Sequence, residues 1–186
     1  MSQDQSCDGV FSRRHFLLGC TALAGSLLVP SAYASIARQP ERRLTLHNLH
    51  TGEQARITYW AEGNYLNESL QEANHLLRDH RTGDVAQMDR ELLDLLYSLQ
   101  QKVENKSEFE VISGYRSPKT NAMLRAKSHG VAKKSLHMQG KAIDIRLPGT
   151  SLKQLRKAAV TLKSGGVGYY PKSNFIHVDT GRVRYW

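Results

Sequence analysis

Cysteine is nearly absent from this chain of 186 residues, and both copies, Cys7 and Cys20, lie near the N-terminus. A disulfide scaffold or a cysteine-rich zinc finger is therefore excluded. No run of about 18 strictly apolar residues occurs, which excludes a protein with several membrane-spanning helices. Acidic residues number only 17 against 26 Lys and Arg, so the formal net charge is +9. The hydrophobic fraction of 40% and the charged fraction of 23% are typical of a folded globular chain.

Residues 1–34 have the pattern of an export signal. Arg13 and Arg14 form a twin-arginine pair, and a moderately apolar run follows from 16 to 29. The run is followed by a small-x-small cleavage pattern at 32–34. The whole segment resembles twin-arginine translocation signals, whose cargo crosses the membrane already folded.

This resemblance implies a mature domain, residues 35–186, that the twin-arginine translocase delivers to the periplasm. We expect no stable membrane insertion after the signal is cleaved. The mature part keeps the net charge of +9, because the leader carries two arginines and two aspartates. The alternatives for the leader are a buried N-terminal helix and a lipidation box ending at Cys20.

Residues 35–186 show the periodicities of both strands and helices, without internal repeats. Apolar and polar residues alternate where we expect strands, and apolar residues recur every three to four positions where we expect helices. The expected strands are 44–49, 56–60, 109–113, 142–147, 167–170 and 175–180; the expected helices cover 67–80 and begin near 89, 117 and 151. The sum is a single α+β domain with a central antiparallel sheet flanked by helices.

Helix starts are marked by capping residues. Asp89 precedes one apolar stripe, Ser117 is followed by Pro118, and Ser151-x-x-Gln154 precedes another stripe. Ser69-x-x-Glu72 resembles a capping box as well. These four patterns predict where the helices of the domain begin.

Two of the expected strands carry residue types that bind metals. Asp144 lies between Ile143 and Ile145, so it points to the opposite face of its strand. An acid in such a place is costly to bury unless a cation or hydrogen-bond donors satisfy it. His177 and Asp179 likewise share one face of the last strand.

His137 and His177 offer two imidazoles, and Asp144 offers one carboxylate. Such a set leaves a fourth position for water, as a catalytic zinc ion requires. Iron in a site of two histidines and one carboxylate is chemically possible too. The alternative is that each residue is an ordinary structural one, and the clustering on two strands favours the metal site.

The segment Ser135-x-His137-x-x-Gly140-x-Ala142-x-Asp144 resembles the signature of the D-Ala-D-Ala carboxypeptidases and LAS zinc peptidases. Beyond that superfamily, the segments 114–117, 130–135, 165–170 and 175–181 are similar to the MepK-type murein endopeptidases. The resemblance covers nearly all of the mature part. It implies a hedgehog/D-Ala-D-Ala-peptidase-like fold.

The resemblance also implies roles for particular residues. His137, Asp144 and His177 would bind Zn²⁺, and Arg116 would face the substrate or the developing oxyanion. Ser135 lies two residues before a ligand, and it and Tyr115 would lie beside the ligands or line the substrate cleft. The implied activity is hydrolysis of peptide cross-links in peptidoglycan, with the direct diaminopimelate–diaminopimelate (3-3) cross-link as the specific substrate.

One position departs from the pattern of these peptidases. Many of them place an acidic general base three residues before the last ligand histidine, where this chain has Asn174. An amide cannot take up a proton, so Asp179 is the candidate base, or else the residue that orients the histidine. Glu62, Glu68 and Glu110 stay open as further candidates.

Three other functions compete with this hypothesis. A D,D-carboxypeptidase or D,D-endopeptidase would use the same metal chemistry on a neighbouring bond. A non-catalytic peptidoglycan-binding module with a structural zinc ion is favoured by Asn174. Nucleic-acid binding is suggested only by the basic charge, and no basic stripe interleaved with aromatic residues supports it. We therefore expect peptidoglycan or muropeptides as partners and no nucleic acid.

Overall fold

A computed structural model describes residues 41–128 and 130–186 of the chain. The predicted signal peptide, residues 1–34, lies outside the described residues. Among the described helices, none combines the length and the apolar character needed to cross a membrane. The described residues fold into one α+β domain, which confirms the fold class expected from the sequence.

The strands of the described residues form one eight-stranded sheet, in the order β3-β2-β1-β4-β5-β7-β6-β8. Their bounds are β1 Arg42–Asn48, β2 Gln54–Ala61, β3 Asn64–Tyr65, β4 Phe109–Ser113, β5 Ala142–Arg146, β6 Gly166–Tyr170, β7 Phe175–Asp179 and β8 Arg184–Tyr185. Neighbouring strands are antiparallel except at β1–β4 and β6–β8, which pair in parallel. The sequence indicated neither parallel pair, because β8 is too short to leave a pattern and β4 is distant from β1 in the chain.

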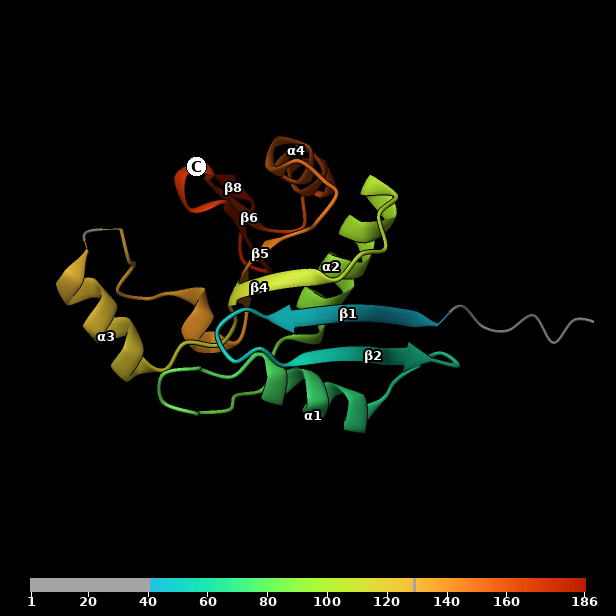
Figure 1. Ribbon diagram of the computed structural model, residues 1–186, viewed down its shortest axis with the longest axis horizontal. Helices are drawn as coiled ribbons and strands as arrows, with labels where there is room; N and C mark the ends of the chain where they lie inside the picture. The colour runs from blue at the N-terminus through green and yellow to red at the C-terminus, as the bar shows by residue number, and fades with distance from the viewer. Residues whose placement is uncertain (1–40, 129) are drawn as a thin grey trace, which may run out of the picture. The chain divides into compact units, whose positions relative to one another are not determined.

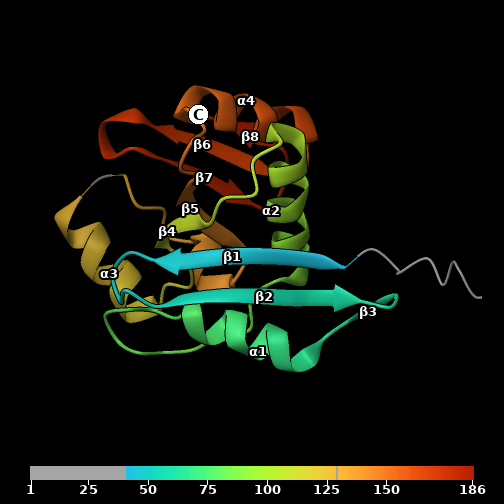
Figure 2. The ribbon, with the colours of Figure 1, turned by 45° about the vertical axis from the view of Figure 1, so that its right-hand side comes forward.

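Four α-helices accompany the sheet in the described residues, together with two short 3₁₀ helices. The bounds are α1 Asn67–Leu76, α2 Arg90–Val103, α3 Pro118–Lys127, α4 Leu152–Leu162, η1 Leu136–Gln139 and η2 Pro171–Ser173. Helix α1 packs against β2, whereas α2 packs against β1 and α4, and α4 lies over β6 and β7 (Figures 1 and 2). Helix α3 stands apart from the other three in both views.

The core lies between the sheet and helices α1, α2 and α4. Leu92, Leu96 and Leu99 on α2 are fully buried, as their spacing predicts. They pack in one cluster with sheet residues that include Leu44 and Phe109. Burying such side chains stabilises a fold by about 1.5–3 kcal/mol each before the entropy cost of folding is counted.

Three of the four predicted helix starts are confirmed. Asp89 accepts a hydrogen bond from the first turn of α2, Ser117 does so for α3, and Ser151 forms a reciprocal capping box with Gln154 in α4. The capping box at Ser69 is wrong. Helix α1 begins at Asn67 after Leu66, which has no side-chain oxygen to cap it, so the serine lies inside the helix.

Helix α1 also ends earlier than expected, at Leu76 rather than near residue 80. Beyond it, the buried carboxylate of Asp79 accepts hydrogen bonds from the backbone N–H of Arg81 at 2.9 Å and of Ser117 at 2.8 Å. These bonds draw the chain out of the helix and join it to the start of α3. The loop after α1 therefore supports the segment 114–117, which leads from β4 into α3.

Segment 114–117 is held by two other parts of the fold, the loop after α1 and the 3₁₀ helix η1. The N–H of Tyr115 donates to the carbonyl of Leu77 at 2.7 Å, and the N–H of Arg116 donates to the carbonyl of His137 at 3.2 Å. With the bond to Asp79, three successive residues are fixed: Tyr115 and Ser117 to the loop after α1, and Arg116 to η1. The direction in which Arg116 leaves the backbone is thereby set.

We expect Asp79→Asn to destabilise the protein by about 1–3 kcal/mol at neutral pH, because a buried hydrogen-bond acceptor loses its charge and one oxygen. Burial raises the pKa of Asp79, but hydrogen bonds from Thr120, Ser117 and Arg81 outweigh burial and hold this pKa well below the ordinary value. A depressed carboxyl pKa contributes stability that is present above the unfolded-state value and is lost as pH falls.

Urea denaturation at a series of pH values measures the effect. The difference between wild type and Asp79→Asn should shrink as pH falls below about 4. The exposed Asp84→Asn serves as the matched control and should change stability little. A difference between wild type and Asp79→Asn that stays constant down to low pH would show that the charge of Asp79 has no stabilising role.

Candidate metal centre

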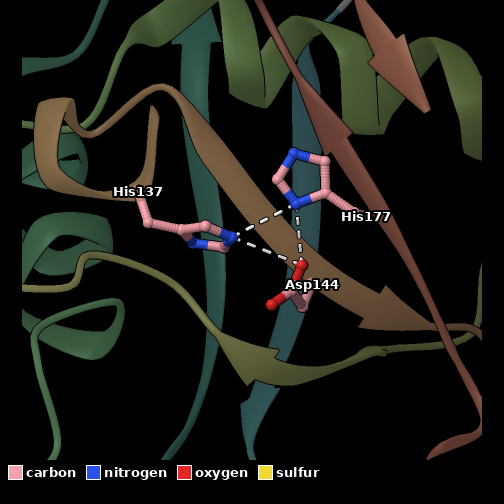
Figure 3. Close-up of side chains that lie close together, drawn as sticks. All are labelled: His137, Asp144 and His177. Atoms are coloured by element: carbon pink, nitrogen blue, oxygen red, sulfur yellow. Dashed lines mark hydrogen bonds and ion pairs between the residues drawn. The ribbon is translucent and has the colours of Figure 1, made fainter. Parts of the chain in front are cut away.

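Three side chains from separate elements meet at the centre of the sheet (Figure 3). Asp144 on β5 lies directly opposite His177 on β7, and His137 approaches from η1. The His177 Nδ1 lies 2.9 Å from Asp144 Oδ1, and the His137 Nε2 lies 3.3 Å from the same oxygen. The two histidine nitrogens are 3.2 Å apart. All three residues are buried, so the predicted ligand set forms one compact cluster.

The other ring nitrogen of each histidine fixes which nitrogen carries a proton. His137 Nδ1 lies 2.8 Å from the carbonyl oxygen of Gly114, which can only accept, so Nδ1 is the donor. His177 Nε2 lies 3.0 Å from the Asp179 carboxylate and donates to it in the same way. In the neutral tautomers the remaining nitrogens are acceptors, and both of them face the Asp144 oxygen. Three buried acceptors thus point at one small region.

A cation bound between the three acceptor atoms would neutralise the repulsion between their lone pairs. A tetrahedral zinc ion with bonds of about 2.0–2.1 Å keeps its ligand atoms about 3.3–3.4 Å apart. The separations of 3.2 and 3.3 Å around His137 match that spacing, whereas the 2.9 Å between His177 Nδ1 and Asp144 Oδ1 is shorter than it. Two imidazoles and a carboxylate therefore fit a zinc ion that has one open position.

The electrostatics of the cluster favour positive charge. Burial raises the pKa of Asp144, but the charges and hydrogen bonds of His137 and His177 outweigh it and hold this pKa well below the ordinary value. Burial lowers the pKa of His177, but Asp144 and Asp179 outweigh it, so this pKa is raised. The cluster thus keeps its carboxylate ionised and attracts a proton or a metal ion.

Asp179 is fully buried directly behind His177. Its Oδ1 accepts from the backbone N–H groups of Gly166 at 3.0 Å and Gly181 at 2.9 Å. Arg184 donates to both carboxylate oxygens, at 3.0 and 2.7 Å. Burial raises the pKa of Asp179, but these bonds and that from His177 outweigh it and depress this pKa. A carboxylate that is saturated with hydrogen bonds and has a depressed pKa suits an orienting role better than proton transfer near neutral pH.

The cluster opens into a cleft of about 390 Å³. Arg116 lines this cleft, and its Nη2 lies 3.7 Å from Asp144 Oδ2 and 3.4 Å from the Ser113 hydroxyl. Its Nε is buried and has no hydrogen-bond partner among the described residues. Burial lowers the pKa of Arg116, although a guanidinium stays protonated at neutral pH. Arg116 thus offers an incompletely paired cation next to the metal cluster.

Of the remaining predicted site residues, one lines the cleft and the others do not. Ser135 lines the cleft and its hydroxyl accepts from the N–H of His137 at 3.4 Å, so it caps the turn that carries this ligand. Tyr115 does not line the cleft; it packs against the core. Asn174 is exposed in the turn before β7, outside the cleft lining.

The three glutamates named as possible bases also lie away from the site. Glu62 and Glu68 are exposed, and Glu110 pairs with Arg146 on the neighbouring strand. Within the described residues, Asp144 is the only acidic side chain that lines the cleft.

Sequence reasoning missed several residues that build the site. Arg184 and Trp186 line the cleft because β8 pairs with β6. No local sequence pattern predicts this pairing. Tyr170 and Phe175 line it as well. The glycine-rich run 165–168 was the available signal, because glycine within a strand marks a close approach of other groups.

We expect Asp179→Asn to weaken zinc binding about 10- to 100-fold, because the partner that orients His177 loses its charge. His177→Ala, which removes a ligand, should weaken binding further. A competition titration against a metal chelator measures both affinities. His75→Ala, an exposed histidine on α1, is the matched control and should leave the affinity unchanged. Unaltered zinc affinity in Asp179→Asn would contradict the orienting role.

Comparison with known proteins agrees with this geometry. Residues 36–186 match the M15 peptidase family described as "Peptidoglycan L,D-endopeptidase MepK". The curated peptidoglycan L,D-endopeptidase MepK of Escherichia coli (strain K12) is 44% identical over 174 residues, covering 94% of this chain and 96% of that protein. The probable peptidoglycan L,D-endopeptidase MepK of Haemophilus influenzae is also 44% identical, over 175 residues and 94% of each chain. The chain therefore belongs to the MepK family of M15 metallopeptidases.

Proposed function

We propose that this protein is a zinc-dependent endopeptidase that hydrolyses peptide cross-links of peptidoglycan, specifically the 3-3 link between two diaminopimelate residues. The observation that carries the proposal is the convergence of two histidine nitrogens and one carboxylate oxygen on the floor of a cleft. The names of the relatives from Escherichia coli and Haemophilus influenzae support the substrate class. The proposed place of action is the periplasm, reached by twin-arginine export.

His137, Asp144 and His177 would hold the zinc ion. When bound, zinc lowers the pKa of water and polarises a carbonyl group, which is the chemistry that peptide hydrolysis requires. The chain's own contribution is to keep the three ligand atoms together before the metal arrives. Gly114 and Asp179 perform this task by holding the two imidazole rings in fixed tautomers and orientations.

Arg116 is proposed to stabilise the negative charge that develops on the scissile carbonyl. A guanidinium that is fixed by its backbone and lacks a full set of partners needs little reorganisation to accept a new oxygen. The same donors suit a carboxylate on the substrate. Ser135 is proposed to keep the His137 turn in place rather than to contact the substrate.

The charge of the cleft fits a peptidoglycan substrate. Arg116, Lys134 and Arg184 line it, whereas Asp144 is its one acidic lining residue among those described. Stem peptides that contain diaminopimelate carry several carboxylates. Attraction between these carboxylates and the basic cleft would raise the local substrate concentration.

The competing role is a zinc-containing peptidoglycan-binding module that does not cleave. It is favoured by the exposed Asn174 and by the single acidic side chain in the described cleft lining. Such a module would bind muropeptides and zinc but release no product. A D,D-endopeptidase differs from the proposed enzyme only in the bond that it cleaves.

We expect the zinc-loaded mature protein to cleave purified muropeptide dimers that are cross-linked directly between diaminopimelate residues. Liquid chromatography with mass detection follows the products. Chelator should stop the reaction, and His137→Ala should reduce the rate roughly 1,000-fold or more, because metal-dependent catalysis is lost. His75→Ala should keep full activity.

Three other results would each overturn part of the proposal. Cleavage only of dimers linked through D-Ala would identify a D,D-endopeptidase. Cleavage that persists in chelator would contradict the metal mechanism. Binding of zinc and muropeptides without any cleavage would identify the binding module.

A further inference from the structure

An exposed tryptophan stands at the mouth of the cleft. Trp186 follows β8 and is 47% exposed, although large aromatic side chains are usually covered. Its backbone is fixed to β6, since its N–H donates to Val167 at 3.2 Å and its carbonyl accepts from Tyr169 at 3.0 Å. The indole is therefore held in place rather than loosely attached, and it lines the same cleft as the metal cluster.

Trp186 is joined to two other aromatic residues of the cleft. Its Nε1 donates to the hydroxyl of Tyr170 at 2.8 Å. The Tyr170 ring stacks on Phe175 with ring centres 4.6 Å apart and an angle of 20° between the planes. The indole also lies 5.3 Å from the ring of the ligand His177. We call Tyr170, Phe175 and Trp186 the aromatic wall, which reaches from the metal cluster to the surface.

A glycine on the neighbouring strand leaves the space that the Trp186 indole occupies. Gly168 lies directly opposite His177 in the β6–β7 pair. A Cβ atom at Gly168 would come within 2.7–2.9 Å of three atoms of the Trp186 ring, closer than real contacts allow. The guanidinium of Arg184 lies 5.0 Å from the centre of the indole and helps to fix it. The position of Trp186 is thus determined from several sides.

The chemistry of the two possible cross-links indicates what the wall recognises. Both links join a carbonyl to the same amine, which belongs to a diaminopimelate residue. They differ on the acyl side, where one carries the methyl group of D-Ala and the other the methylene chain of a second diaminopimelate. Apolar methylenes pack well on aromatic faces, while the carboxylate at the far end of the chain suits the basic residues Arg116 and Lys134 of the cleft.

We propose that Trp186 is a specificity-determining residue, whose indole in the aromatic wall receives the methylene chain of the diaminopimelate on the acyl side of the scissile bond. This inference rests on the proposed function and adds the part of the substrate that the cleft selects. A methyl group reaches less of the wall than a methylene chain does. The enzyme therefore gains more from Trp186 with 3-3 dimers than with D-Ala-linked dimers.

The first test compares kcat/KM of the zinc-loaded mature enzyme on the two kinds of dimer. We expect Trp186→Ala to lower the value for the 3-3 dimer about tenfold or more, mainly through KM, and to affect the D-Ala-linked dimer far less. Gly168→Ala, which displaces the indole without removing it, should act in the same direction. Trp60→Phe, at the other tryptophan and outside the cleft lining, is the matched control.

Zinc affinity is measured on the same variants to separate recognition from damage to the metal cluster. The proposal expects it to be unchanged in Trp186→Ala. An equal loss of activity on both dimers, or unchanged activity on both, would overturn the proposal. A loss that follows weakened zinc binding would overturn it too, because Trp186 would then act on His177 rather than on the substrate.

The second test does not depend on hydrolysis. The chain has only two tryptophans, so Trp60→Phe leaves Trp186 as the single fluorescent tryptophan. Titration with the uncross-linked tripeptide muropeptide, which ends in diaminopimelate, should change its emission at about tenfold lower concentration than the tetrapeptide ending in D-Ala. Equal responses, or none, would overturn the inference. If no dimer is cleaved yet the tripeptide is preferred, the proposed hydrolysis fails and the recognition by Trp186 stands.

Discussion

The site depends on the repulsion among three buried acceptor atoms. His137 Nε2, His177 Nδ1 and Asp144 Oδ1 lie within 3.3 Å of one another, and water has little access to them. Hydrogen bonds to Gly114 and Asp179 direct the imidazole protons away from the cluster. Such an arrangement costs free energy unless a cation fills it. Metal binding therefore removes a free-energy cost of the folded state. The packing of the rest of the domain keeps the three atoms together despite their repulsion.

The scaffold supports each part of the site from a distance. The β5–β7 pair sets Asp144 and His177 opposite each other, and the loop after α1 fixes the segment that carries Gly114 and Arg116. Because Gly114 also holds His137, one segment both orients a candidate metal ligand and places the Arg116 guanidinium beside the cluster. Segment 184–186 also combines two such contacts, since Arg184 holds Asp179 behind His177 and Trp186 borders the cleft. Ligand geometry and substrate contact are therefore coupled through short segments with few degrees of freedom.

Sequence patterns predicted the parts of this arrangement that local geometry determines. Alternation along a strand decides which face a residue occupies, so Asp144 and His177 could be assigned to the site before their pairing was known. His137 joined them through a motif. Whether Asp179 acts as a base or orients a neighbour could not be read, because both roles place it on the same strand face. Its contacts with Gly166, Gly181 and Arg184, which the sequence did not predict, are the reason for proposing the orienting role.

Long-range contacts were beyond the reach of the sequence. Asp79 and Ser117 are 38 residues apart, and no sequence pattern near either position predicts the hydrogen bond between them. β8 has only two residues, too few for a periodicity, so Trp186 could not be placed in the cleft. Ser69 shows the opposite failure, a capping pattern that lies inside a helix. Local chemistry thus predicts the candidate ligands, whereas the groups that orient them become visible only when distant segments meet.

The central claim is that these three atoms bind one metal ion. The most direct measurement is a crystal structure of the zinc-loaded protein with anomalous data at the zinc edge. We predict a single strong peak bonded to His137 Nε2, His177 Nδ1 and Asp144, with a fourth position open to the cleft. A zinc ion bound elsewhere, or a cluster that stays metal-free at saturating zinc while the protein remains folded, would contradict the account.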